Sequence, residues 1–444
     1  MKFLRAILLA GLGLLPIIGQ AAGDNQGKPN AGANQTILDT AGHYPIPGSY
    51  AATILGTPPQ LRPDLPKQVD SRRLALEVLP GLSKPEVFFY DEGLHATFAK
   101  QDKKAPLIFL IAGTGSNDLA GNLDTMMKAF HQAGFHVVTL PSPTHPNFII
   151  SASRSHIPGD QHDDAEDLYA VMEAAMKEVQ SEIEVSNFYL AGYSLGGTNA
   201  AFVAKLDEQR KRFNFQKVLL INPAVNVYES VKRIEATLDG IPGGPKKIGN
   251  FFNSMVEKFT QTYRQGTHTA FDDNFLYSVV TSHELTQEEK GGLIGLSFRI
   301  NSAGMIFASD VMTNGGYVVP KNRIIGSTDN LDDYFRVSVH LSFLQYFDEY
   351  FYPYFQAKRP GLTKAQLIDA QSLKNIENYL KSSTKIGAVT NENDFILSAE
   401  ERDYLKSLFG DRTKIYPVGG HLGNLAFKDN VAYMLNFFKP AGDK

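Results

Sequence analysis

The fold of this chain is decided by the stretch Phe188-Tyr189-Leu190-Ala191-Gly192-Tyr193-Ser194-Leu195-Gly196-Gly197. It centres a Gly-x-Ser-x-Gly motif on Ser194. Val185–Ala191 is an apolar run typical of a buried strand, and the alanine-rich Leu195–Lys205 predicts a helix. Between them the backbone must reverse within a residue or two, and Gly192 and Gly196 leave room for that strained turn. We therefore expect Ser194 to stand clear of the sheet, over the positive end of the helix, as a nucleophile.

A nucleophilic serine needs a base, and the base needs an acid that orients it. Lys385–Thr390 predicts a late strand, and the polar turn after it contains Asp394, which we predict to be the acid. Glu392 lies in the same turn and is chemically competent, so it remains an alternative. Asp394 could also serve only to form the turn.

The predicted base is His421, near the C-terminus. A helical stretch, Ala399–Phe409, and a short strand, Lys414–Val418, lead into Gly419-Gly420-His421-Leu422-Gly423. The flanking glycines allow the loop to bring the imidazole within hydrogen-bond reach of Ser194, as proton transfer requires. The alternative is a solvated loop histidine.

The chain order Ser194, Asp394, His421, with each residue just past a predicted strand, resembles the α/β-hydrolase superfamily. The resemblance covers most of Leu74–Lys439. It implies a catalytic triad of these three residues in a serine hydrolase. It also implies a doubly wound, mostly parallel sheet of the α/β class.

Such a triad works with an oxyanion hole, a pair of donors that bind the charge on the carbonyl oxygen of the substrate. One expected donor is the backbone N–H of Leu195. The resemblance places the second in the loop after the strand Pro106–Ala112, where we assign Thr114 N–H, with Gly115 as substitute. Ala112 stands where the superfamily often has a histidine, so the identity of the second donor stays open.

The rest of the chain alternates as a doubly wound sheet requires. Three opening strands are predicted at Leu74–Leu79, Glu86–Tyr90 and Leu94–Phe98, the last two joined in a hairpin across Asp91-Glu92-Gly93. A parallel part follows, made of strand Pro106–Ala112, helix Leu123–Ala133, strand His136–Leu140, helix Asp163–Val179, strand Val185–Ala191, helix Leu195–Lys205 and strand Lys217–Ile221.

A large insertion interrupts this alternation after Asn222-Pro223, and the alternation resumes near Lys385. Its spacing is mostly helical, at the point where the superfamily commonly inserts a cap. We predict a cap at residues 224–383 and a core at residues 45–223 and 384–444. Aromatic residues in the cap recur on one helix face and either pack its own core or line an apolar substrate pocket: Phe343, Tyr346, Phe347, Tyr350, Phe351 and Tyr354.

Two patterns suggest other chemistry. The glycines in Gly113-Thr114-Gly115 could open a dinucleotide-binding unit, but Asp118 occupies the third glycine position and would oppose the phosphates. A second cluster resembles metal ligands: His162, Asp163, Asp164 and Asp167. Acidic residues are favoured in the first turn of a helix, however, and Asp163 can cap this one. We expect neither a cofactor nor a metal.

The loop Pro141–Asp160 follows a predicted strand and so faces the same rim as Ser194. It contains His145, Ser153, Arg154 and His156. It is either a surface loop or a further contact for substrate.

The first residues are typical of a signal peptide. Lys2 and Arg5 precede the apolar run Ala6–Ile18, and small residues follow. The run is shorter than the ~20 residues of a membrane anchor, so we expect cleavage near Ala21 to Gly23. Residues 24–44 would then form a flexible leader. The chain has no cysteine, which excludes disulfides and lipid attachment through an N-terminal cysteine. An exported bacterial protein, periplasmic or secreted, is expected.

The expected reaction is hydrolysis of a carboxylic ester, with a small-molecule or lipid acyl ester as substrate. A serine peptidase of the same superfamily and an exported binding protein without turnover are the alternatives. A net charge of -4 and the lack of a basic tract argue against nucleic acid as a partner. The oligomeric state is left open.

Overall fold

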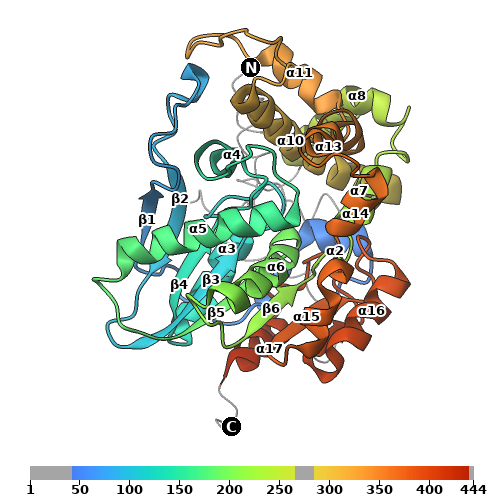
Figure 1. Ribbon diagram of the computed structural model, residues 1–444. Coiled ribbons are helices and arrows are strands. Elements are labelled where there is room, and N and C mark those ends of the chain that lie inside the picture. Colours follow the sequence, from blue (N-terminus) through green and yellow to red (C-terminus); the bar gives the residue numbers. More distant parts are fainter. Residues whose placement is uncertain (1–42, 266–284, 440–444) are drawn as a thin grey trace.

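A computed structural model describes residues 43–265 and 285–439. The predicted signal peptide, residues 1–23, and residues 24–42 of the predicted leader lie outside the described residues. An eight-stranded sheet runs through the centre of the molecule (Figure 1), in the order β1-β2-β4-β3-β5-β6-β7-β8. Its strands are β1 (Ser71–Leu76), β2 (Leu94–Ala99), β3 (Ala105–Ile111), β4 (His136–Leu140), β5 (Val185–Tyr193), β6 (Val218–Ile221), β7 (Ile386–Asn391) and β8 (Thr413–Tyr416).

The sheet is mostly parallel, as predicted. β1 pairs with β2 and β2 with β4 in antiparallel register, and every other neighbouring pair is parallel. Parallel strands are covered on both faces and therefore carry almost continuous apolar runs, as β3 does. The carboxyl ends of β3 to β8 meet at one edge, which is where polar loops can converge.

The predicted opening hairpin is wrong. Glu86–Phe88 is a short 3-10 helix, and β2 pairs instead with β1. The side chains of Val87 and Phe88 are buried against the helices of the insertion and do not belong to the sheet. Asp91 accepts hydrogen bonds from Lys84 Nζ at 2.5 Å and Asn147 Nδ2 at 2.7 Å, which fixes this turn away from the strand pairing.

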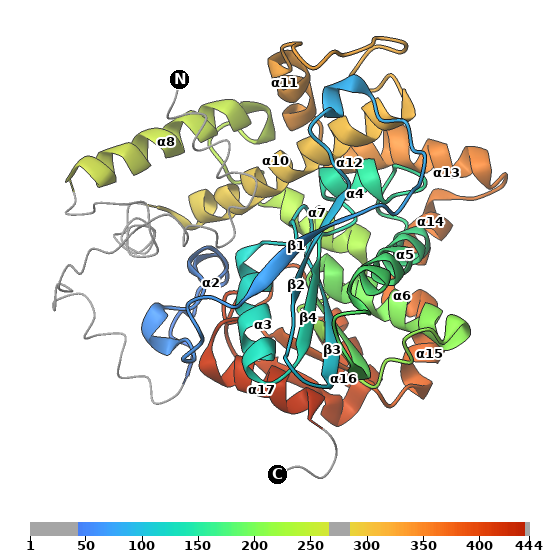
Figure 2. The same cartoon turned by 90° about the vertical axis from the view of Figure 1, so that its left-hand side faces the viewer.

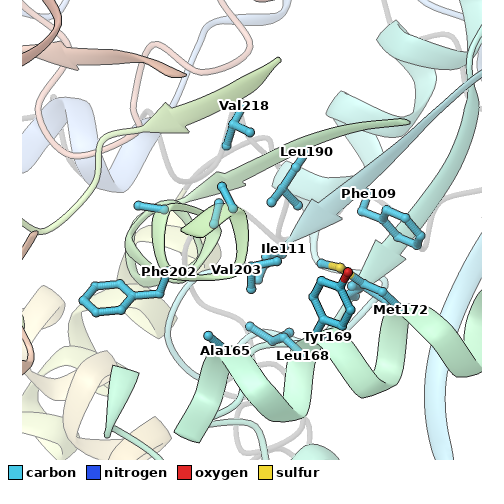
Figure 3. Packing of buried hydrophobic residues seen from close by; sticks show 14 of the residues in the cluster. Phe109, Ile111, Ala165, Leu168, Tyr169, Met172, Leu190, Phe202, Val203 and Val218 are labelled. Carbon is cyan, nitrogen blue, oxygen red and sulfur yellow. The ribbon is translucent and has the colours of Figure 1, made fainter. Parts of the chain in front are cut away.

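Helices cover both faces of the sheet. On one face lie α5 (Gln161–Val179) and α6 (Leu195–Arg210), and Figure 3 shows their apolar side chains against those of the central strands. On the other face lie α3 (Gly121–Gln132) and α17 (Lys428–Phe438). The predicted α/β fold class is therefore confirmed.

Helices are the main secondary structure described in the insertion between β6 and β7, with loops such as residues 314–331 between them. Most of its helices gather beyond one end of the sheet (Figure 2): α7 (Val227–Ala236), α8 (Ile248–Gln265), α10 (Gln287–Thr313), α11 (Asp332–His340), α12 (Phe343–Tyr346) and α13 (Tyr352–Lys358). The two helices that follow, α14 (Lys364–Ala370) and α15 (Glu377–Ser382), lead back toward the core. Its last part returns to the core, because Leu373, Ile376 and Leu380 pack in the same apolar cluster as the sheet.

The aromatic face of the insertion packs the insertion itself. Phe343, Tyr346, Phe347 and Phe351 are all buried in one cluster with α10. The predicted single helix is interrupted, since Phe347–Phe351 is a π-helical segment between α12 and α13. Proline at the start of α13 lacks the N–H that an unbroken α-helix would need there, which favours the wider turn.

Three further α-helices belong to the described residues. They are α2 (Ser49–Leu55), before the sheet, α4 (Pro146–Ser151), after β4, and α16 (Ala399–Phe409), between β7 and β8. Within residues 43–265 and 285–439, no helix has both the length and the apolar character needed to cross a bilayer.

Candidate active site

Ser194 occupies the turn between β5 and α6. Its backbone angles, φ 55° and ψ -127°, lie in a region that residues other than glycine rarely adopt. Such a conformation costs on the order of 1–3 kcal/mol. A side chain at Gly192 would collide with the carbonyl oxygen of Gly196. A side chain at Gly196 would collide with the backbone of β3. The turn is therefore the strained one that the motif predicted.

The structure brings the three predicted triad residues together. His421 Nε2 lies 2.9 Å from Ser194 Oγ. His421 Nδ1 lies 3.1 Å and 3.2 Å from the two carboxylate oxygens of Asp394. With Nδ1–H donating to the carboxylate, Nε2 is free to accept the serine proton. Asp394 and His421 are both buried, so the contact between imidazole and carboxylate is shielded from water.

Asp394, and not Glu392, faces the histidine. Asp394 Oδ2 accepts a hydrogen bond from Asn222 Nδ2 at 2.8 Å, and Oδ1 accepts one from the Ile396 N–H at 3.2 Å. The Glu392 side chain is 60% exposed and lies 3.4 Å from Arg402. The alternative acid is therefore turned outward. Asn222 was missed, although its place just after β6 could have pointed to it.

Of the predicted oxyanion donors, Leu195 follows Ser194 directly, and the loop that carries Thr114 passes close to Ser194 at Gly113. Leu195 is the first residue of α6, so its N–H has no acceptor within the helix. Gly113, after β3, is so close that an added Cβ would lie 3.0 Å from Ser194 Cβ. Thr114 follows directly. Gly115 N–H, the substitute donor, donates to Thr144 Oγ1 at 2.8 Å and is thus already engaged.

The segment after β4 supports the loop that carries Thr114. Thr144 Oγ1 and Ser142 Oγ are 2.9 Å apart, and the Ser142 N–H donates to the Ser116 carbonyl at 2.9 Å. The next residue, His145, caps α4 by accepting the Asn147 N–H at 3.2 Å. Burial lowers the pKa of His145 to about 4, so its imidazole is neutral at pH 7.

The other polar residues of the loop Pro141–Asp160 have partners within the protein. Arg154 Nε donates to Asp167 at 2.6 Å, and His156 Nδ1 lies 2.6 Å from the Ile149 carbonyl. Ser153 Oγ accepts the His156 N–H at 3.1 Å. These contacts give the loop a structural role, and its contact with substrate stays a prediction.

The histidine loop is held by asparagines. Asn391 Nδ2 donates to the Gly420 carbonyl at 2.7 Å, and Asn393 Oδ1 accepts the Gly420 N–H at 2.9 Å. Gly420 has φ 58° and Leu422 has φ 67°, so this loop also depends on left-handed backbone. Both polar groups of Gly420 are thus fixed directly before His421.

The cluster at the start of α5 is structural. Asp160 caps the helix by accepting the N–H groups of His162 and Asp163, so the prediction that Asp163 is the cap is wrong. Asp160 lies one turn earlier, in the extended backbone that an N-cap requires. Burial, together with the nearby charge of Asp167, raises the pKa of Asp164 well above its usual value. No group of three metal-ligating side chains occurs in the part of the chain that the structure describes.

The loop after β3 is fastened at Asp118 to the antiparallel strands. The guanidinium of Arg73, on β1, donates to both carboxylate oxygens of Asp118, at 3.1 Å and 2.8 Å. Thr97 Oγ1 donates to the same carboxylate at 2.8 Å. A negative, fully bonded side chain at this position does not fit a pyrophosphate.

Comparison with known proteins finds likeness only among solved structures. No protein-family model matches the chain, and neither does any curated protein sequence. The thioesterase domain from the curacin biosynthetic pathway has 12% sequence identity and a TM-score of 0.37, and the match covers 83% of this chain and 99% of that one. An esterase from Pyrococcus furiosus has 8% identity and a TM-score of 0.39, with 85% and 96% covered. Est1E from Butyrivibrio proteoclasticus has 12% identity and a TM-score of 0.35, and the match covers 78% of this chain and 95% of that one.

The architecture of this chain is itself the stronger observation. Its parallel strands place the Ser194 turn after β5, the Asp394 turn after β7 and the His421 loop after β8, all at one edge of the sheet. That order along the chain is the α/β-hydrolase order. We therefore assign the chain to the α/β-hydrolase fold on the order of its strands and on the turn that carries Ser194.

Proposed function

We propose that this protein is a serine hydrolase that cleaves carboxylic esters through an acyl-enzyme on Ser194. The observation that carries the proposal is the continuous contact from Ser194 Oγ through the His421 imidazole to the Asp394 carboxylate. A serine hydroxyl is a weak nucleophile until a base accepts its proton, and this arrangement supplies the base and its orientation.

The first half of the reaction acylates the enzyme. His421 Nε2 accepts the hydroxyl proton while Oγ forms a bond to the ester carbonyl carbon. The oxyanion that results is bound by the N–H of Leu195 and, in our assignment, that of Thr114. His421 then gives its proton to the departing alcohol oxygen as the carbon–oxygen bond of the ester breaks. Asp394 stabilises the imidazolium and holds its Nδ1–H.

The second half releases the acid. Water attacks the acyl carbon and gives a proton to His421 Nε2, a second tetrahedral oxyanion forms in the same place, and Ser194 Oγ leaves and recovers the proton. Every proton is carried by the His421 side chain. Apart from the substrate and the attacking water, the steps as proposed use side-chain and backbone groups of this chain.

The position of the helical insertion supports a role for it as a cap over this site. A side chain at Gly115 would lie 2.8 Å from Asn301 Cβ, so α10 packs directly on the loop of the proposed oxyanion hole. We propose that residues 224–383 contain the cap and that it limits which esters reach Ser194. Export to the periplasm or medium, with removal of residues 1–23, is proposed from the sequence alone.

Covalent labelling tests the nucleophile. The mature protein is treated with a fluorophosphonate probe beside the variants Ser194→Ala and His421→Ala. We expect labelling of the wild type and none of either variant, because one variant lacks the nucleophile and the other its base. A wild type that stays unlabelled while binding ligands would favour the non-catalytic binding protein.

A substrate comparison separates esterase from peptidase. Short and long acyl esters are compared with aminoacyl arylamides on the same enzyme preparation. We expect at least one ester to have a higher kcat/KM than every arylamide. Arylamide turnover above that of all esters would identify a peptidase instead.

A further inference from the structure

We propose that α2 completes the active site and that Thr53 is a positioning residue for His421. This proposal rests on the proposed function, because it assigns the support of the same base. α2 lies before the first strand, in a part of the chain that carries no catalytic motif. The His421 N–H nevertheless donates to Thr53 Oγ1 at 2.8 Å.

The Thr53 hydroxyl is oriented for this contact. Thr53 Oγ1 donates its only proton to the Ser49 carbonyl, one helical turn earlier, at 2.8 Å. A hydroxyl has one proton and two lone pairs, so this bond turns a lone pair toward the His421 N–H. Thr53 is 3% exposed, and no bulk water is available to replace it as the acceptor.

The backbone of the histidine loop lies directly on α2. Gly420 has φ 58°, and a side chain there would collide with the Ser49 carbonyl and lie 2.6 Å from Thr53 Oγ1. At Gly423, a side chain would collide with the Ala52 carbonyl. The glycines on both sides of His421 therefore do more than give the loop freedom, because they allow helix and loop to touch.

Hydrogen bonds fasten the segment around α2 at both ends. Before the helix, Asn393 Nδ2 donates to the Pro47 carbonyl at 2.9 Å, while its Oδ1 holds the Gly420 N–H. After the helix, Thr57 Oγ1 donates to the Gly423 carbonyl at 2.9 Å. The helix thus has a fixed position relative to the loop.

Aromatic contacts also connect α2 to the imidazole ring. The rings of Tyr50, on α2, and Phe395 meet edge to face at 5.3 Å, and Phe395 meets the His421 ring edge to face at 6.1 Å. Three supports therefore converge on the base: Asp394 at Nδ1, Phe395 at the ring and Thr53 at the backbone. Loss of the backbone support shifts Nε2 relative to Ser194 Oγ without touching a substrate group.

The test is Thr53→Val, which keeps the shape of the side chain and removes the hydroxyl. We expect kcat for an ester to fall roughly 10–100-fold with KM within about twofold, because a small misplacement of a proton-transfer group is costly. Thr53→Ser restores the hydroxyl and is expected to recover kcat to within about threefold of wild type.

A matched control is Thr125→Val in α3. Thr125 Oγ1 donates to the carbonyl one turn earlier, Gly121 O, at 3.0 Å, as Thr53 Oγ1 does to Ser49 O, and this bond lies within α3. We expect Thr125→Val to keep kcat within about twofold. Equal losses of kcat in the two valine variants would overturn the positioning role, and so would a serine variant as impaired as the valine variant.

A second variant keeps the proposal testable if Thr53→Val does not fold. Asn393→Ala cuts the link between Pro47 and Gly420 at a partly exposed site, and we expect kcat to fall about fivefold at unchanged KM. Unchanged kcat in Asn393→Ala would then overturn the proposal. Fluorophosphonate labelling of the wild type distinguishes failure of the proposed function from failure of the role of α2. An unlabelled wild type would contradict the proposed function, whereas a labelled wild type with unaffected variants would contradict only the role of α2.

Discussion

The turn that carries Ser194 and the loop that carries His421 are stabilised in opposite ways. Both use left-handed backbone, with φ 55° at Ser194 and φ 58° at Gly420. The serine turn is held by its immediate surroundings, since the Ser194 N–H donates to the Ile221 carbonyl of the neighbouring strand at 2.8 Å. The histidine loop is held by nearby asparagines and also by Thr53, whose contact with His421 spans 368 residues. The turn of the proposed nucleophile thus depends on strands that are its neighbours in the sheet, while the position of the proposed base also depends on a distant part of the chain.

The largest effect is expected on the histidine side, from Asp394→Asn. An asparagine amide that donates to Nδ1 would favour the tautomer with its proton on Nε2, which cannot accept the Ser194 proton. We expect kcat to fall roughly 10³–10⁴-fold. Steady-state kinetics with an ester substrate measures the change.

Glu392→Gln is the control for that variant. The Glu392 side chain is exposed and lies beside Arg402, so we expect kcat to change less than about twofold. A larger loss from Glu392→Gln than from Asp394→Asn would show that the acid has been misassigned.

Around Ser194, we expect the largest loss of stability from Gly196→Ala. The new Cβ would collide with the carbonyl oxygens of Ile111 and Ala112, and the β3 backbone has no room to retreat. We expect a loss of about 4 kcal/mol in the free energy of unfolding, measured by urea denaturation.

Gly249→Ala, in α8, is the matched substitution in open space. An added Cβ there has no neighbour within 4 Å among the described atoms. We expect the free energy of unfolding to stay the same or rise by up to about 1 kcal/mol. Similar losses in the two alanine variants would argue against steric crowding at the serine turn.

We expect low pH to destabilise the segment that supports the loop of Thr114, through protonation of His145. Burial lowers the pKa of this group to about 4 in the folded protein, so the unfolded chain binds its proton first as pH falls below about 6.5. The stability that depends on neutral His145 is complete above pH 6.5 and is lost as pH falls toward 4. His145 keeps some contact with water, so the loss of unfolding free energy is smaller than the full change in pKa would give. We expect it to be on the order of 2 kcal/mol.

His145→Asn isolates this effect. Asparagine can still accept the Asn147 N–H as an N-cap but does not titrate in this range. The difference in unfolding free energy between wild type and variant, measured at pH 7 and pH 4, cancels the other titrating groups. A difference that does not change with pH would exclude His145 as the source.

The smallest effect is expected from Ser194→Gly. Glycine adopts the backbone angles of this turn without strain, and part of that gain is offset by the greater freedom of glycine in the unfolded chain. We expect a gain of about 1 kcal/mol in unfolding free energy. Ser194→Ala keeps the strained backbone and should show no gain, so equal stability of the two variants would place the strain elsewhere.

The sequence was sufficient where the structure is local. The strand, turn and helix around Ser194 follow from apolar periodicity and two glycines, and the placement of Asp394 and His421 follows from the strands that precede them. The choice between Asp394 and Glu392 could be made only from the structure, because the side chains of residues two apart in a turn can point in different directions.

Prediction failed where distant packing decides. Val87 and Phe88 are residue types typical of strands, but they are buried against the insertion and the segment forms a short 3-10 helix instead. Likewise, an interval of three or four between aromatic residues does not reveal the extra residue of a π-helical turn at Phe347–Phe351. Thr53 had no signal at all, since one threonine in a short helix is common and its partner is near the other end of the chain.

The contact between Thr53 and His421 also sets an order of events for the growing chain. The helix that supports the proposed base is made 368 residues before the base itself. Closing so long a loop comes late in folding, because its entropy is lost before the contact forms. In our proposal, a partly synthesised chain that already contains the Ser194 turn lacks the base until His421 has been made.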